Sequence, residues 1–173
     1  MTDEWVYHVD KEDNVIGKVM KSEAWDKKLF HRGASVIVFN SKGEIFVHQR
    51  AEIKKVYPLL FDFLAGGWSD YGETYEESAK RETSEELGIP KPDVKEIEKF
   101  KYDTDFDKYF CILYYCIYDG KLTLQEEEVK EGSFVSFEEL EKMFNEKEFC
   151  PDTVFIWNKF KTKINEIRDN IIK

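Results

Sequence analysis

The sequence predicts an α/β protein in which helices cover both faces of a mixed central sheet. Short apolar runs typical of strands alternate with capped or amphipathic segments typical of helices. Their order along the chain is strands, helix, strands, helices. The apolar faces of such elements are most simply buried when helices form layers on the two sides of one sheet. A chain of 173 residues is long enough for one domain with a sizeable core, so we expect residues 1–173 to form a single domain.

Two hairpins are predicted in the first third of the chain. Apolar-rich segments that flank a polar turn indicate an N-terminal hairpin over about residues 4–20. Residues 34–39 and 44–50 flank an Asn-Ser-Lys-Gly turn and predict a second hairpin. A short apolar segment at 59–64 then runs into Ala-Gly-Gly.

The clearest helix is predicted over residues 75–87. Thr74 is followed three residues later by Glu77, which is the pattern of a capping box. Gly88 and Pro90 are typical of the residues that end a helix.

The remaining elements are predicted from alternating apolar residues and from helix start signals. Further strands are expected at 94–102, 108–118 and 131–136. Ser136, followed by Glu139, is a second capping-box pattern and opens a short helix that ends near residue 145. The last helix is expected over about 152–171, where Ile and Phe recur every three or four residues.

The composition is that of an ordinary soluble protein and excludes several functional classes. Lys and Arg number 26 against 36 Asp and Glu, so the net charge is −10, and we expect no sequence-independent nucleic-acid binding. The longest apolar run, about 110–118, is too short for a membrane helix, and the acidic N-terminus does not resemble a secretory signal. Three cysteines without metal-site or disulfide spacing favour a reducing compartment, so we expect a cytoplasmic protein.

The predicted helix at 75–87 concentrates negative charge. At about 100° per residue, Glu82, Glu85 and Glu86 fall within a sector of roughly 100°, at the edge of the face that should be buried. Like charges at this spacing, near the C-terminus of a helix, destabilise it. A hard divalent cation would offset the repulsion, because Mg²⁺ and Mn²⁺ prefer oxygen ligands. The same run also fits a solvated acidic face, and the helix alone does not decide between the two.

The spacing of charged residues and glycines around this helix resembles the signature of the Nudix hydrolase family. The matching positions are Gly67, Glu73, Arg81, Glu82, Glu85, Glu86, Gly88 and the aliphatic Ile89. They fall in the loop, helix and tight stop that the motif requires. Thr83 departs from the pattern, which usually has an aliphatic residue there, but its hydroxyl can bond to a carbonyl of the preceding turn. The resemblance implies a Nudix-type α/β/α sandwich with its box at 67–89.

Carried over to the matching residues, the resemblance implies a metal-dependent, MutT-like diphosphate hydrolase. Nudix enzymes use bound Mg²⁺ or Mn²⁺ to hydrolyse a nucleoside diphosphate linked to another group. By analogy, the metal would be bound by Glu82, Glu85, Glu86 and the carbonyl of Gly67. Glu73 and Arg81 would hold the helix in place, and Arg81 is spaced to pair with Glu73, Glu77 or Glu85. Two candidates are open for the general base: Glu82, and the run Glu126, Glu127 and Glu128, which also fits a solvated acidic turn.

A second resemblance, over about residues 3–160, is to the isopentenyl-diphosphate isomerase branch of the superfamily. It is carried by the segments 10–17, 29–34, 47–51 and 149–151. The isomerases need a catalytic Cys and a metal-binding His, but Ala65 and Gly67 hold those places, and Tyr109 stands where a glutamate is expected. Because alanine cannot transfer a proton, we expect a hydrolase on an isomerase-like scaffold. The alternatives are an isomerase that uses another acid, and a non-catalytic nucleotide-binding module.

The substrate is predicted only as a small diphosphate compound, most simply a nucleotide. Arg50 ends a predicted strand that leads toward the site and is a candidate for holding a phosphate. Trp68, with Tyr71 and Tyr109 as alternatives, is a candidate for stacking on a base, and His31 is expected to be structural. We expect no nucleic-acid or membrane partner, and a homodimer would use the N-terminal hairpin or the C-terminal helix.

Overall fold

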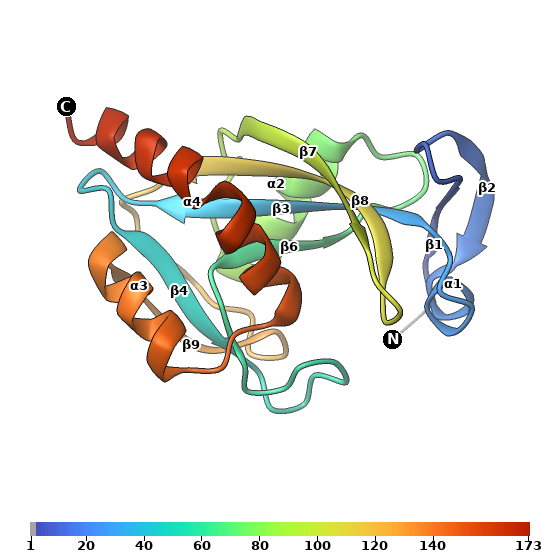
Figure 1. Cartoon of the computed structure of the whole chain (residues 1–173), viewed down its shortest axis with the longest axis horizontal. Coiled ribbons are helices and arrows are strands. Elements are labelled where there is room, and N and C mark those ends of the chain that lie inside the picture. Colours follow the sequence, from blue (N-terminus) through green and yellow to red (C-terminus); the bar gives the residue numbers. More distant parts are fainter. Residues whose placement is uncertain (1–2) are drawn as a thin grey trace.

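The computed structural model of the chain describes residues 3–173 and shows a mixed sheet with helices on both faces (Figure 1). Seven strands of the described residues form this sheet: β3 (His31–Phe39), β4 (Ile45–Arg50), β5 (Phe61–Asp62), β6 (Leu64–Trp68), β7 (Lys95–Asp103), β8 (Lys108–Ile117) and β9 (Val129–Val135). Their order is β5-β4-β3-β8-β7, with β6 also paired to β3 and β9 to β4. β3 and β8 run parallel and the other pairs antiparallel, which confirms the predicted mixed sheet.

Two hydrophobic cores lie on the two faces of the sheet. One face is covered by α3 (Phe137–Glu146) and α4 (Pro151–Ile171), and the other by α2 (Tyr75–Leu87). Cys111 and Cys116, five residues apart on β8, contribute to different cores because alternate side chains of a strand face opposite sides. The apolar face of α4 packs on the sheet in this core, and dimerisation through the helix stays a prediction. Within residues 3–173, no helix is both long and apolar enough to cross a membrane.

Helix α2 begins and ends where the sequence predicts. The Thr74 side chain accepts a hydrogen bond from the Glu77 N–H, and the Glu77 carboxylate accepts one from the Thr74 N–H, which completes the capping box. Gly88 ends the helix with φ 67°, a left-handed conformation that glycine adopts without strain. Thr83 is buried, and its hydroxyl donates to the Ala79 carbonyl at 2.7 Å, so the departure from the family pattern is accommodated within the helix.

The N-terminal hairpin consists of β1 (Trp5–Val9) and β2 (Val15–Met20), followed by a short helix α1 (Lys21–Asp26) that the sequence did not predict. Asp13 in its turn fixes the hairpin to the rest of the molecule. Its buried carboxylate accepts hydrogen bonds from Arg32 Nε at 2.7 Å and from the Tyr75 hydroxyl at 2.9 Å. The hairpin therefore sits over the start of β3 and the first turn of α2.

The predicted second hairpin is wrong in extent. β3 and β4 pair only through Phe39 and Ile45 next to their connecting turn. The reason is competition for strand edges: β8 pairs along one edge of β3, and β6 takes the other edge over Gly33–Ile37. β4 pairs instead with β9 over six residue pairs and with β5. β6 and β4 therefore share one edge of β3: β6 pairs over residues 33–37 and β4 only at Phe39.

Candidate active site

Three carboxylates of α2 face the end of β6 in an order of decreasing burial. Glu86 is 8% exposed as a residue, the Glu82 side chain is 14% exposed, and the Glu85 side chain is 53% exposed. The geometry confirms that the acidic sector lies at the edge of the buried face, because one member is in the core and another is in solvent.

Arg81 ties this cluster to the preceding loop. Its Nε and Nη2 donate to the two carboxylate oxygens of Glu73 at 2.8 and 3.0 Å. Its Nη1 donates to Glu82 at 2.8 Å and to Glu85 at 3.2 Å, and Nη2 also donates to the Trp68 carbonyl at 3.1 Å. The carboxylates around the guanidinium raise the pKa of Arg81 above its usual value. Of the three predicted partners, the structure provides Glu73 and Glu85, while Glu77 is used in the helix cap.

Glycines at the end of β6 allow the carboxylates to approach the strand. A Cβ at position 67 would lie 2.7 Å from Glu82 Oε1, so any side chain there would displace that carboxylate. The backbone N–H of Gly66 donates to Glu86 Oε2 at 3.0 Å. Strand β6 and helix α2 are therefore in direct polar contact at Gly66, and the Glu82 carboxylate occupies the space beside Gly67.

The environment of Glu86 disfavours its negative charge. Burial is the main cause that raises the pKa of this carboxyl well above its usual value, and the nearby Glu82 and Glu128 carboxylates raise it further. The Gly66 N–H is the hydrogen-bond donor that opposes this effect. A buried carboxylate among other carboxylates is the arrangement that a cation would relieve.

The donor set fits a hard divalent cation that is completed by other ligands. Within residues 3–173, no group of three or more His, Cys, Asp or Glu side chains is already arranged around a metal position. Arg81 donates hydrogen bonds to two of the α2 carboxylates, Glu82 and Glu85. Mg²⁺ usually keeps several waters and binds through one or two carboxylates plus substrate phosphates, and Glu82, Glu86 and the Gly67 backbone are chemically suited to that role.

One member of the acidic run at 126–128 belongs to this site. Glu126 and Glu127 are exposed, whereas Glu128 is half-buried and close enough to Glu86 to raise the pKa of Glu86. The Gln125 N–H donates to the Glu86 carbonyl at 2.9 Å, which places this loop beside the end of α2. Of the three acidic residues in this run, Glu128 is the one that lies close to the α2 carboxylates.

Sequence comparison with known proteins assigns the chain to one family. A sequence model of the NUDIX domain matches residues 29–153. An uncharacterized Nudix hydrolase of Pseudomonas aeruginosa is 34% identical over 151 residues, which are 87% of this chain and 89% of that protein. This chain belongs to the Nudix hydrolase family. The Nudix hydrolase YfcD of Escherichia coli K12, also described as uncharacterized, is 32% identical over 163 residues, 92% of this chain and 89% of that protein.

Solved structures show the same fold. The protein DR0079 of Deinococcus radiodurans superposes with a TM-score of 0.76 over 90% of this chain and 98% of that chain, at 22% identity. A MutT protein of Methanosarcina mazei gives a TM-score of 0.65 over 79% of this Nudix chain and 94% of that chain, also at 22% identity. The predicted Nudix-type sandwich is therefore confirmed.

The three aromatic residues predicted as possible substrate contacts differ in their surroundings and burial. One face of the Trp68 ring is covered by the buried His31 ring, with centroids 3.2 Å apart and planes 5° apart, and Lys21 Nζ is 5.9 Å from the Trp68 ring. Tyr71 is exposed and packs against Tyr7 of the hairpin. Tyr109 donates weakly to Asp152 at 3.4 Å and lies beside the core. A base that stacks on Trp68 would have to use the ring face not covered by His31.

Arg50, at the end of β4, contacts the loop that follows this strand and lies near Asp62. Its Nη2 donates to the Val56 carbonyl at 3.2 Å, and its buried Nε has no hydrogen-bond partner in the described structure. Asp62 of β5 is buried beside it, accepts hydrogen bonds from the Thr153 hydroxyl at 2.7 Å and the Leu64 N–H at 2.9 Å, and contributes to the raised pKa of Glu86. Sequence reasoning missed Asp62, although a single acid inside the apolar segment 59–64 was a usable signal.

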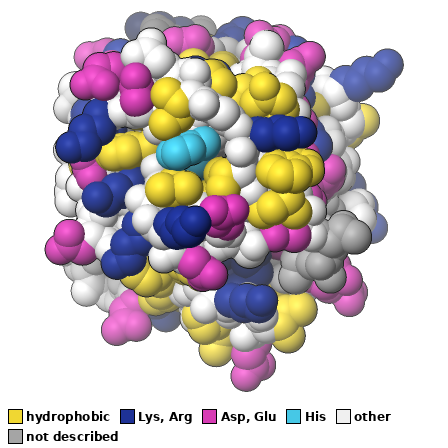
Figure 2. Space-filling model, turned by 90° about the vertical axis from the view of Figure 1, so that its right-hand side faces the viewer, with side chains coloured by type: hydrophobic (Ala, Val, Ile, Leu, Met, Phe, Trp, Pro, Cys, Tyr) yellow, Lys and Arg dark blue, Asp and Glu magenta, His cyan; other side chains and the backbone are white. Residues whose placement is uncertain are grey.

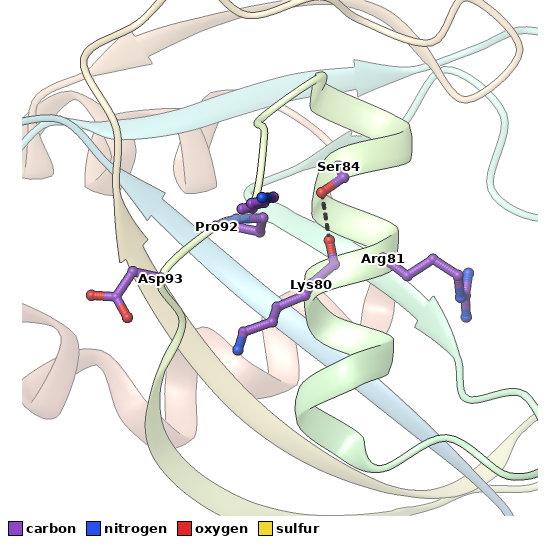
Figure 3. A pocket seen from close by; sticks show the side chains of 6 residues that line it. Lys80, Arg81, Ser84, Pro92 and Asp93 are labelled. Carbon is purple, nitrogen blue, oxygen red and sulfur yellow. Dashed lines mark hydrogen bonds between the residues drawn. The ribbon is translucent and has the colours of Figure 1, made fainter.

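A surface pocket beside α2 shares only Arg81 with this cluster. It is lined by Lys80, Arg81, Ser84, Lys91, Pro92 and Asp93 (Figure 3). In that view the Arg81 side chain points away from Lys80 and Asp93, in keeping with its bonds to the carboxylates. Lys80 is exposed and already paired with Glu76, so we assign the pocket no part in the chemistry.

Proposed function

We propose that this Nudix hydrolase cleaves a diphosphate bond in a nucleoside diphosphate linked to another group, with Mg²⁺ or Mn²⁺ held by Glu82, Glu85, Glu86 and the Gly67 carbonyl. The supporting observation is the buried Glu86 carboxylate, whose charge is opposed by neighbouring carboxylates and supported by one backbone N–H. When bound, the metal would neutralise the diphosphate and lower the pKa of an attacking water.

The chain's own residues would orient the reacting groups. Arg81 and Glu73 hold the loop and helix together, so the Glu82 and Glu86 carboxylates keep a fixed separation from β6. Glu82 is the first candidate for the base that accepts the proton of the attacking water, because it is partly exposed and its pKa is raised by burial. Glu128 is the second candidate, because it faces the same carboxylates from the opposite loop.

For the substrate, Arg50 and Trp68 remain our proposed contacts. A guanidinium with an unpaired Nε–H has donor capacity left for a phosphate oxygen. Trp68 is half-buried between His31 and the cluster of Val6, Val19 and Ala24, so an aromatic group would contact only the exposed part of its ring, with Lys21 nearby for an anionic group. The NUDIX domain of NrtR from Shewanella oneidensis, which has a similar fold (TM-score 0.61, 12% identity), was solved with ADP ribose. We take from it the fold alone.

Two alternatives are distinguished by particular residues. The isomerase-like branch is also a proposal, and isomerisation would need an acid in place of Ala65, which is buried in the core beside α2. A nucleotide-binding module without turnover is disfavoured because Arg81 binds Glu82 and Glu85 in one network and Glu86 lies near Glu82. Binding of nucleotides without product at saturating Mg²⁺ would favour that module.

The test is a panel of nucleoside diphosphate-linked compounds assayed with Mg²⁺ and with Mn²⁺. We expect Glu82→Gln and Glu86→Gln to lose about 10²–10³-fold in turnover. Each substitution removes the negative charge of a proposed metal ligand, and the metal would stabilise the negative charge that develops on the diphosphate. Glu76→Gln is the matched control: it lies on the same helix, is exposed and pairs only with Lys80 among the described contacts. Unchanged turnover in both site variants, with the fold intact by circular dichroism, would refute the assignment.

A further inference from the structure

The loop at residues 51–60, which joins β4 to β5, is attached to the candidate metal site by an ion pair. Lys54 Nζ donates to the Glu128 carboxylate, and the two side chains are 24% and 27% exposed. Glu128 in turn lies close to Glu86, whose pKa it raises. The ammonium of Lys54 is therefore the cation that now neutralises a carboxylate facing the metal site.

A chain of backbone hydrogen bonds fixes this arrangement. The Gln125 N–H donates to the Glu86 carbonyl, the Glu128 N–H to the Gln125 carbonyl, and the Ala51 N–H to the Glu128 carbonyl, each at 2.9 Å. The end of α2, the 125–128 turn and the start of the 51–60 loop are thus linked in series. These bonds hold residue 128 beside the C-terminal end of α2, with its side chain paired to Lys54.

The rest of the loop makes few contacts, and two of its residues have unfavourable backbone dihedral angles. Tyr57 and Leu59 have φ values of 52° and 64°, a left-handed region that side chains with a Cβ seldom adopt. The Tyr57 ring rests on Phe106, with centroids 5.5 Å apart, and Phe106 is itself 47% exposed. Arg50 and Gln49 each donate one side-chain hydrogen bond to a loop carbonyl. Such a loop stays in place only while its anchoring contacts persist.

We propose that Lys54 is a latch: it competes with the divalent cation for Glu128, and entry of the cation displaces it and loosens the 51–60 loop. The inference rests on the proposed metal site. A divalent ion carries twice the charge of an ammonium and binds carboxylate oxygen directly, so it displaces Lys54 once it is bound at Glu86. Arg50, which holds the Val56 carbonyl of the same loop, would be released for substrate in the same step.

The experiment measures Mn²⁺ binding by calorimetry and amide hydrogen exchange of the 51–60 loop by mass spectrometry, with no substrate present. Lys54→Met should tighten Mn²⁺ binding about two- to fivefold. This factor corresponds to the free energy that a partly exposed ion pair contributes. Its loop should exchange, without metal, as fast as the wild-type loop does with saturating Mn²⁺. Lys55→Met is the matched control, since it removes the same charge from the next, exposed residue.

The outcomes separate this proposal from the one it rests on. No Mn²⁺ uptake by the wild type would remove the metal site itself. If the wild type binds Mn²⁺ but Lys54→Met binds it equally or more weakly, the latch alone is wrong. Equal tightening in Lys54→Met and Lys55→Met would also overturn the latch, because the effect would then be one of overall charge.

Discussion

Glu86 combines deep burial with negative charge, and its neighbours define what the site can do. The Gly66 N–H stabilises one carboxylate oxygen, while Glu82, Glu128 and Asp62 all disfavour the charge. A residue in such a place destabilises the metal-free protein, because its charged form is paired incompletely. Either protonation of the carboxyl or a bound cation would relieve this conflict, and the proposed metal site rests on the second of these.

His48 is the second residue whose environment forces one protonation state. It is 4% exposed beside Phe46, and burial lowers its pKa from 6.5 to about 3, so it is neutral in the folded protein near pH 7. The unfolded chain therefore binds this proton first as the pH falls. The stability that neutral His48 contributes is complete above pH 6.5 and is lost between pH 6.5 and 3.

The predicted consequence is a weaker pH dependence in His48→Leu. Between pH 7 and pH 5 the wild type should lose up to about 2 kcal/mol of unfolding free energy through this residue, and the variant should not. Urea unfolding of both proteins at the two pH values checks this. The same loss in wild type and variant would show that His48 is not held neutral.

At the scale of elements, the buried Asp13 carboxylate anchors the turn of the N-terminal hairpin, in addition to backbone contacts of β1 such as the bond from the Tyr71 N–H to the Trp5 carbonyl. Asp13 is 8% exposed and lies between Arg32, Tyr75 and Lys99, which come from β3, α2 and β7. The hairpin also exposes Trp5, Val15 and Ile16, and Figure 2 shows hydrophobic side chains mixed with charged ones at this end of the molecule. Dimerisation through the hairpin stays a prediction.

We expect Asp13→Asn to lower the unfolding free energy by about 2 kcal/mol, because it leaves the partly buried Arg32 without its counter-charge. Amide exchange in β1 and β2 should become faster at the same time. Asp10→Asn is the control, since Asp10 is in the same turn but bonds only to neighbouring residues, and it should change stability by no more than about 0.5 kcal/mol. Equal effects of the two substitutions would contradict the anchoring role of Asp13.

Local signals predicted elements well, and they failed where pairing is non-local. The capping box at Thr74 and the stop at Gly88 are contained in one short stretch of sequence, so α2 was predicted with its correct ends. The parallel pairing of β3 with β8 joins residues almost eighty positions apart, and no local pattern encodes it. For the same reason the β3–β4 hairpin was predicted too long, and the short helix α1 has no side-chain cap that would have marked its start.

For the whole molecule, the candidate site is assembled from parts that differ in how predictable they are. The α2 carboxylates, Arg81, Glu73 and Gly67 were found from their spacing, because the motif lies in one loop and one helix. Asp62 and Glu128 come from another strand and a loop, and only the fold brings them close to Glu86, as it brings Lys54 to Glu128. Sequence reasoning offered Glu126, Glu127 and Glu128 equally, and only burial distinguishes Glu128 from the others.

The central claim is that the crowded carboxylates of α2 form a divalent cation site, and direct titration with Mn²⁺ tests it. Calorimetry should show saturable uptake by the wild type, and Glu86→Gln should weaken that uptake at least about tenfold, since even the loss of groups outside the ligand set costs that much in metal sites. Glu76→Gln, on the exposed side of the same helix, should bind as the wild type does. Equal Mn²⁺ affinity in wild type and Glu86→Gln, or no uptake by either, would contradict the account.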